Sequence, residues 1–370
     1  MKIFISIPWF LPAYKAGGPI QSIANLIHHF SENVEYYIFC GDTDLNDEPL
    51  QNITKGEWVY YNDFTKIWYA PKENLSETLT KQVTALQPNV LYIIGLFNWH
   101  FNIVPLLFCK ANKKILSVRG MLHPGALTQK KWKKRIFLEA LKLYAVSSRT
   151  LFHATDETEA IFIKNIFGSK ASVQIAGNFS KKIIHNQPLP KLEGELKLLT
   201  VALISPMKNH LEVLKALMFC NGNVSYNIYG PVKDDAYWIL CKQQITLLPQ
   251  NIAVHYHGEL LPHNVENVLA HHHVFIMPSK SENFGHAIIE ALTAGKPVIT
   301  SNATPWNNLQ KNNAGINTTP TENDIASAIN FFTTLSNDQY HAASKAASNY
   351  AESNINISEK IHAYHNLFFN

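Results

Sequence analysis

The sequence predicts an α/β protein made of two Rossmann-like, doubly wound domains. Its 370 residues suit two domains of ordinary size. Short apolar runs rich in β-branched and aromatic residues alternate with longer helix-like segments, which is the order expected of parallel sheets. A polar, proline-containing stretch at residues 180–195 divides this series in two, as an interdomain linker does.

The first domain is predicted at residues 1–180. Its strands are expected at residues 2–7, 35–40, 90–94, 114–118 and 151–154. Helical segments at 20–30 and 127–144 lie between them. The apolar run at the N-terminus lacks the length and the cleavage site of a signal peptide, so we interpret it as a buried first strand.

The second domain is predicted at residues 181–352. Its strands are expected at 198–202, 224–229, 254–257, 274–277 and 298–300, with helices at 211–219 and 286–294 between them. The C-terminal stretch 353–370 contains an amphipathic helical segment, which we expect to pack back on the first domain. Open parallel sheets bind ligands at the carboxyl ends of their strands. We therefore expect the two domains to face each other across a cleft and the ligand to bind in that cleft.

Composition narrows the class of protein. Hydrophobic residues make up 46% of the chain and charged residues 16%, which suits two buried cores and argues against disorder. The net charge of +4 is too small to indicate a nucleic-acid partner, and it suits an anionic ligand or membrane surface. The four cysteines lie far apart, which argues against a metal or redox site and favours a reduced, cytoplasmic compartment.

One apolar stretch is long enough to span a bilayer. Residues 90–109 carry no formal charge, but Asn98, His100, Asn102 and Pro105 interrupt them. Such residues are costly in hydrocarbon. The stretch is therefore predicted to be a buried strand, a loop and a short helix.

Residues 277–298 form the most informative run. They read as strand, loop, helix, glycine stop and strand. Gly285 permits a tight loop at the start of the helix. The free backbone N–H groups of Phe284, Gly285 and His286 would then suit a phosphate.

Two glutamates bracket this turn, eight residues apart. Glu282 lies in the loop, and Glu290 lies just over one turn into the helix. A carboxylate at either place can accept hydrogen bonds from sugar hydroxyls, each worth about 1.5–3 kcal/mol. The alternative is a pair of solvent-facing glutamates on an ordinary strand–helix unit.

The E-x7-E pattern resembles the donor-site signature of the retaining GT-B glycosyltransferases of family 4, the group 1 glycosyl transferases. Supporting matches follow along most of the chain, at residues 16–19, 117–122, 153–159, 204–209 and 304–306. Each is weak alone, but their order and spacing together are specific.

The resemblance implies roles for individual residues. Glu290 would hold the ribose diol of the donor, Glu282 would face hydroxyls of the transferred sugar, and Lys208 would neutralise the diphosphate. Glu282 and Lys208 are thereby candidate catalytic residues, together with Arg119. Further candidate donor contacts are Gly17, Gly18, Asn283, Phe284, Gly285 and His286.

Two positions depart from the family pattern. Leu203 stands where the family usually has an arginine aimed at the diphosphate. Arg119 follows the strand after which many members have a histidine, and His123 comes four residues later. Arg119 and His123 are candidate acceptor contacts, and the alternative for Arg119 is a structural ion pair.

The resemblance implies neither a metal nor another cofactor. Asp42-Thr-Asp44 resembles the D-x-D metal motif of the other large glycosyltransferase fold, but here it follows the second predicted strand. The run His271–His273 has no cysteine or carboxylate cluster beside it and is interpreted as a helix end.

The activity implied is transfer of a hexose-like sugar, with retention, from a UDP- or GDP-sugar to a saccharide or lipid-linked acceptor in surface polysaccharide or glycan biosynthesis. The basic run 130–135 lies on an amphipathic helix that could meet a lipid pyrophosphate or the inner face of a membrane, or could be a solvated face. Leu203 favours one rival, a sugar-nucleotide-binding protein without catalysis. A nicotinamide-dependent oxidoreductase is rejected, because Gly17-Gly18 does not supply G-x-G-x-x-G.

Overall fold

The computed structural model describes residues 1–127, 131–144, 146–181 and 188–370. It divides into two compact units, one formed by Met1–Phe179 with Ile357–Asn370 and one by Ser180–Asn356. The second unit extends to residue 356 instead of 352, because helix α13 (Asn337–Asn354) runs on past the expected end. Within the predicted linker, residues 182–187 lie outside the described residues.

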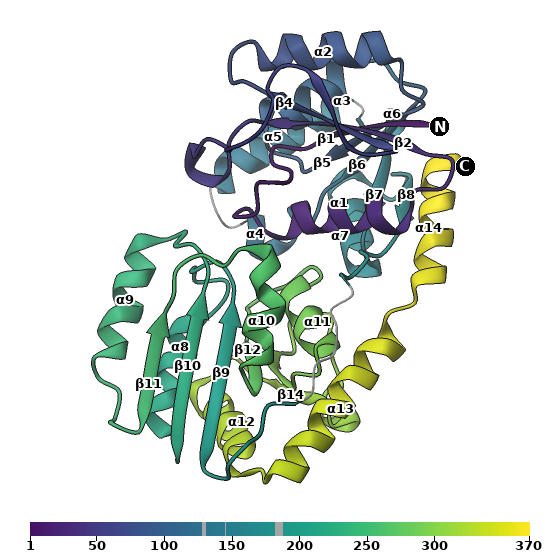
Figure 1. Ribbon diagram of the computed structural model, residues 1–370. Coiled ribbons are helices and arrows are strands. Elements are labelled where there is room, and N and C mark those ends of the chain that lie inside the picture. The colour runs from purple at the N-terminus through teal and green to yellow at the C-terminus, as the bar shows by residue number, and fades with distance from the viewer. Residues whose placement is uncertain (128–130, 145, 182–187) are drawn as a thin grey trace. The chain divides into compact units, whose positions relative to one another are not determined.

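The first unit is built on an eight-stranded sheet of order β3-β4-β2-β1-β5-β6-β7-β8 (Figure 1). All neighbours are parallel except β3 and β4, which form an antiparallel hairpin. The strands are β1 (Lys2–Ser6), β2 (Glu35–Gly41), β3 (Trp58–Asn62), β4 (Thr65–Ala70), β5 (Val90–Ile94), β6 (Lys113–Ser117), β7 (Leu151–Ala154) and β8 (Val173–Ile175). Strands β3, β4 and β8 were not predicted.

Helices cover this sheet, and alternate residues of its strands belong to two separate hydrophobic clusters, with Phe4 in one and Ile3 and Ile5 in the other. The helices are α1 (Gly18–His29), α2 (Leu75–Leu86), α3 (Val104–Phe108), α4 (Pro124–Leu127), α5 (Lys131–Leu143), α6 (Val146–Arg149), α7 (Glu157–Phe167) and α14 (Ile357–Phe369). The predicted helix 127–144 is thus represented by the end of α4 and by α5, and residues 128–130 between them lie outside the described residues.

Helix α14 closes the first unit although it comes last in the chain (Figure 1, yellow). Its residues Tyr364, Leu367 and Phe368 are fully buried in the same cluster as Ile3 and Ile5. Residues 90–109 form β5, a π-helical turn (Trp99–Ile103) and α3, as expected. Within the described ranges, no helix combines the length and the apolar character needed to cross a membrane.

The second unit has a six-stranded sheet, all parallel, of order β11-β10-β9-β12-β13-β14. Its strands are β9 (Glu195–Val201), β10 (Asn223–Tyr229), β11 (Ile252–Tyr256), β12 (Val274–Met277), β13 (Val298–Ser301) and β14 (Gly315–Thr318). Its other helices are α8 (His210–Ala216), α9 (Asp235–Ile245), α10 (Val265–Ala270), α11 (His286–Thr293) and α12 (Glu322–Thr334). Two doubly wound parallel sheets confirm the predicted fold class.

Short 3-10 turns complete the connections, at Leu45–Asp47, Leu217–Phe219, Pro262–Asn264 and Gln310–Asn312. In the second unit the chain builds outward from β9 through β10 to β11. It then returns to the other side of β9 at β12. The order of the strands therefore reverses between β9 and β12, and this switch point is where open α/β sheets bind ligands.

Candidate functional site

The loops after β9 and β12 carry two of the predicted site residues. These strands are hydrogen-bonded neighbours, with Val274 opposite Leu198 and Phe275 opposite Leu199. Because the strands are parallel, the loops that follow them leave the same edge of the sheet. Lys208 lies on the first loop and Glu282 on the second.

An ion pair joins these two loops. The Lys208 ammonium donates to the Glu282 carboxylate, which also accepts a hydrogen bond of 2.8 Å from the Ser279 hydroxyl. A backbone bond of 2.9 Å from Lys280 N to Met207 O ties the loops a second time. The side chains of Lys208 and Glu282 are 21% and 10% exposed, so a cation and an anion lie largely covered at the switch point.

Gly285 begins helix α11. Its φ of +73° lies in the left-handed region, which favours glycine, and its carbonyl accepts from Ile288 N at 2.9 Å. A Cβ at this position would stand 3.1 Å from Ile288 Cδ1. Any other residue would therefore strain both the backbone and the packing of the loop that carries Glu282.

Trp306 holds this loop from the side. Its indole N–H donates to the carbonyl of Phe284, and the two rings meet edge to face with their centroids 5.3 Å apart. The sequence had marked residues 304–306 only as a family-like segment. The structure gives Trp306 the task of positioning the start of α11.

Glu290 lies half-buried on α11. Burial raises the pKa of this carboxyl to about 7, and the positive charge of Lys181 opposes the rise. A half-buried carboxylate is an acceptor suited to ligand hydroxyl groups. It is also a cost to the stability of the unit.

That cost makes a prediction about stability and pH. The unfolded chain releases the Glu290 proton near the ordinary pKa of 4.5, whereas the folded chain holds it until about pH 7. The folded state therefore binds more protons over this window, and stability falls as pH rises through it. We expect Glu290→Gln to raise the free energy of unfolding by about 1–3 kcal/mol at pH 8. Melting at pH 8 and pH 4 measures this, and an equal gain at both values would contradict it.

His210 is a buried residue beside Lys208 that the sequence did not single out. It is 1% exposed, and neither ring nitrogen has a hydrogen-bond partner in the described part of the chain. Burial, together with the nearby charge of Lys208, lowers its pKa to about 3, so the ring is neutral. A neutral His210 therefore does not replace the positive charge of the arginine that the family usually has at the position of Leu203. Leu203 itself is half-buried in the loop after β9.

In the first unit, Gly17 and Gly18 lie between β1 and α1. Gly17 caps α1 with φ +74°, and a Cβ there would meet nothing within 4 Å, so the backbone angle alone favours glycine. Asp44 fixes the preceding residues, because its carboxylate accepts from Tyr14 N at 2.9 Å and Lys15 N at 3.2 Å. The same carboxylate accepts from the amide of residue 45 at 2.7 Å.

Asp42, the other acidic residue of the D-x-D run, also has a protein partner. It forms an ion pair of 2.7 Å with Lys55, and its side chain is 12% exposed. Both carboxylates are therefore engaged in the structure of the first unit.

Arg119 follows β6 in a left-handed conformation, with φ +50°. Its guanidinium donates to the Asn178 side chain and, at 2.9 Å, to the hydroxyl of Tyr92. Burial opposes its charge, but Tyr92 and Tyr364 more than compensate and raise the pKa of the guanidinium above its usual value. Arg119 thus connects β5 and α14 within the first unit through the neutral side chains of Tyr92 and Tyr364, whereas the structural alternative was an ion pair.

His153 occupies the centre of the same network. Its Nε2 lies 2.8 Å from the carbonyl of Ala176, and because a carbonyl can only accept, Nε2 carries the proton. Nδ1 then accepts from the hydroxyls of Tyr92 at 2.8 Å and Ser117 at 2.9 Å. The ring is fully buried, which lowers its pKa to about 3 and keeps it neutral.

Glu159 completes this arrangement. Its carboxylate accepts from the backbone N–H of Gly120 and from both the N–H and the hydroxyl of Thr155, at 2.7 and 2.9 Å. The family-like segment 153–159 therefore holds the loop of Arg119 in place. His123 makes local contacts, since its Nδ1 accepts from Gly125 N at 3.1 Å and its ring lies against Phe162.

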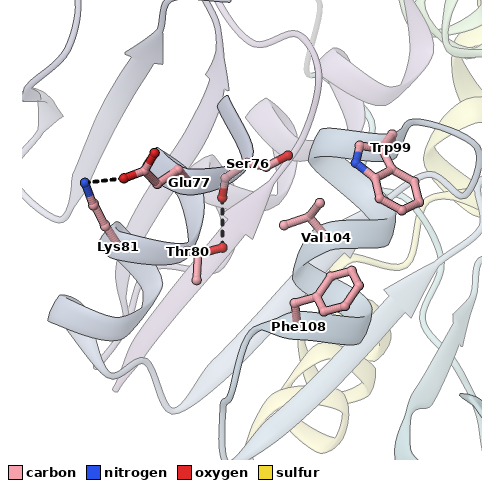
Figure 2. Close-up of a pocket in the computed structure, with 7 residues that line it drawn as sticks. All are labelled: Ser76, Glu77, Thr80, Lys81, Trp99, Val104 and Phe108. Atoms are coloured by element: carbon pink, nitrogen blue, oxygen red, sulfur yellow. Dashed lines mark hydrogen bonds and ion pairs between the residues drawn. The ribbon is translucent and has the colours of Figure 1, made fainter. Parts of the chain in front are cut away.

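A separate hollow of about 430 Å³ lies on the first unit between α2, the π-helical turn and α3. Figure 2 shows Trp99, Val104 and Phe108 on one wall and Ser76 and Thr80 on the other. Glu77 and Lys81, joined by a 2.6 Å ion pair, also line it. None of the predicted site residues lies in this hollow.

The second unit matches a known family. Residues 181–350 match the family model described as glycosyl transferases group 1. No curated protein matches the chain at the level of its sequence.

Solved structures match the whole chain. One is the complex of Anabaena Alr3699/HepE with UDP and glucose, at 16% identity and a TM-score of 0.72, with 99% of each chain covered. Another is sucrose-phosphate synthase from Thermosynechococcus elongatus, at 17% identity and 0.68, covering 99% of this chain and 98% of that one. A third is the UDP-forming α,α-trehalose-phosphate synthase from Burkholderia xenovorans, at 11% identity and 0.68, with both chains fully covered. At these identities the matches establish the GT-B fold alone.

Proposed function

We propose that this chain, whose residues 181–350 match the family model of the glycosyl transferases group 1, is a glycosyltransferase. It would move a hexose-like sugar, with retention, from a nucleotide-sugar donor to a saccharide or lipid-linked acceptor, as the resemblance to family 4 implies. The observation that carries the proposal is the joining of Lys208 and Glu282 at the switch point, beside a helix that begins with Gly285 and carries Glu290. Lys208 suits a diphosphate, Glu282 suits the hydroxyls of a sugar, and Glu290 suits those of a ribose.

Each role follows from the charge and surroundings of the residue. Lys208 neutralises the diphosphate as it leaves, and the N-terminus of α11, with Asn283, Phe284 and His286, adds backbone N–H groups. Glu282 accepts from hydroxyls of the transferred sugar. It is already oriented by Ser279.

Glu290 accepts from the ribose diol, for which its half-buried carboxylate is suited. In the first unit, Gly17 and Gly18 are proposed as donor contacts, and Arg119 and His123 as acceptor contacts. Arg119 already uses two of its five N–H groups to donate to Asn178 and Tyr92, so its proposed role would rest on the other N–H groups.

A UDP-sugar is the first donor to test, because the HepE structure is a complex with UDP and glucose and the trehalose-phosphate synthase is described as UDP-forming. A thermal-shift series with UDP, GDP, ADP and their sugars identifies the base. Release of nucleoside diphosphate from the best donor, without and with saccharide acceptors, then tests for turnover. Binding without turnover on any acceptor would favour the alternative that Leu203 raises, a sugar-nucleotide-binding partner protein.

Sugar transfer is expected to survive EDTA, because a lysine and a helix N-terminus take the charge of the diphosphate. Asp42 and Asp44 are occupied by Lys55 and by backbone N–H groups. The measurement is the initial rate before and after chelation, with Mn²⁺ or Mg²⁺ added back. Loss that either ion restores would revive the D-x-D run as a metal site.

Leu203→Arg is expected to raise turnover severalfold or to tighten diphosphate binding. The half-buried leucine lies in the loop that leads to Lys208, where a second cation would strengthen the hold on the leaving group. Leu203→Lys and Leu203→Gln, of similar length, separate charge from bulk. A melting curve must accompany each rate, and unchanged kinetics in a folded Leu203→Arg protein would contradict the expectation.

A further inference from the structure

Helix α5 presents an apolar stripe to solvent. Trp132, Ile136 and Leu143 are 76%, 69% and 88% exposed. With about 100° per residue, these three side chains lie within about 40° of one another around the helix. Leu138 and Leu141 are buried on the other side of the helix, in the core of the first unit. The helix therefore has two apolar faces, and only one of them is covered.

Basic residues flank the uncovered stripe. Lys133 lies on one side of it and Arg135 and Lys142 on the other, all exposed. Glu139 lies within the stripe, but its charge is neutralised by Lys142 at 2.9 Å. The exposed face thus combines large apolar groups with a net positive charge.

A hollow of about 380 Å³ adjoins the side of Arg135 and Lys142. Its apolar lining residues are Pro124, Leu127, Leu138 and Ile166, and its charged ones are Lys134, Arg135, Lys142 and Glu139. An apolar lining with three cations and one carboxylate carries a net positive charge, which suits an anionic lipid with its phosphate and acyl chains.

We propose that the outer face of α5 docks this protein onto an anionic membrane surface. Trp132, Ile136 and Leu143 enter the boundary between headgroups and acyl chains, and Lys133 and Arg135 bind the phosphates. An isolated exposed aromatic residue needs no explanation, but three large apolar side chains on one basic helix face do. The proposal rests on the proposed function only in that a lipid-linked acceptor would lie on the same surface.

Co-sedimentation with vesicles tests the proposal on the full chain, without donor. We expect binding to phosphatidylcholine vesicles that contain about 30% phosphatidylglycerol, and little binding to phosphatidylcholine alone. Trp132→Ser with Ile136→Ser should weaken this binding at least tenfold. Lys133→Gln with Arg135→Gln should weaken it at low salt and remove most of its salt dependence.

The matched control is Ile239→Ser with Leu240→Ser on α9, two apolar side chains that are 51% and 50% exposed without this basic pattern. It should leave vesicle binding unchanged. Binding that survives the Trp132 variant, or no binding by the wild type, would overturn the proposal. So would a wild-type dimer, seen by sedimentation, that the Trp132 variant dissociates, because the face would then be a protein interface. Glu290→Ala, which tests the donor site, should keep vesicle binding, so the two proposals fail separately.

Discussion

Replacing Lys208 with alanine is expected to lower the turnover of sugar transfer by two to three orders of magnitude. As the glycosidic bond breaks, the diphosphate gains negative charge, so a cation beside it stabilises the transition state more than the ground state. Loss of one preorganised contact to such a charge costs about 2.7–4 kcal/mol. Because Leu203 stands in place of the usual arginine, Lys208 is expected to provide a larger share of the stabilisation of the diphosphate charge. Single-turnover rates at saturating donor measure the effect.

The ion pair between Lys208 and Glu282 determines which control variants the Lys208→Ala experiment needs. Lys208→Ala leaves a carboxylate that is 10% exposed without its cation, so part of any loss could come from the fold. Lys208→Ala combined with Glu282→Gln removes that charge, and Lys208→Arg keeps the cation. Lys215→Ala is the matched control, since Lys215 pairs with Glu212 and Glu322 in the same unit. If Lys208→Ala transfers sugar at the wild-type rate, the diphosphate site lies elsewhere.

The alternation of apolar runs and helical segments was enough to predict both parallel sheets. It missed strands where that signal is weak. Strand β14 reads Gly-Ile-Asn-Thr and β8 has three residues, and each lies at the edge of its sheet. The hairpin β3–β4 was also missed, because β3 is an edge strand with exposed tyrosines and shows no clear alternation.

The candidate site was only partly predictable. The resemblance named Lys208 and Glu282 separately, but their contact spans 74 residues and depends on β9 and β12 being neighbours. Pairing of strands distant in sequence is not visible in local patterns. The same limit applies to Arg119, whose partners Tyr92, Asn178 and Tyr364 come from three distant segments. The sequence could offer only the general alternative of a structural ion pair.

Glu290→Ala is expected to weaken binding of the preferred nucleoside diphosphate by about 2–4 kcal/mol, or roughly 30- to 1,000-fold, because a diol makes two charge-assisted bonds to one carboxylate. Calorimetry at pH 8, where this carboxylate is ionised, measures the loss. Glu266→Ala on α10 is the control, since it removes a half-buried helical glutamate elsewhere in the same unit. It should leave the affinity unchanged.

The pKa of Glu290 adds a second signature to the same experiment. With a pKa of about 7, the free carboxyl is mostly protonated at pH 6 and mostly ionised at pH 8. A ligand that needs the carboxylate should therefore bind about tenfold more weakly at pH 6. Glu290→Gln should abolish that part of the pH dependence, and the difference between the two proteins cancels the titration of the diphosphate itself. Unchanged affinity in a folded Glu290→Ala protein, or the same pH profile in Glu290→Gln, would remove Glu290 from the ribose site.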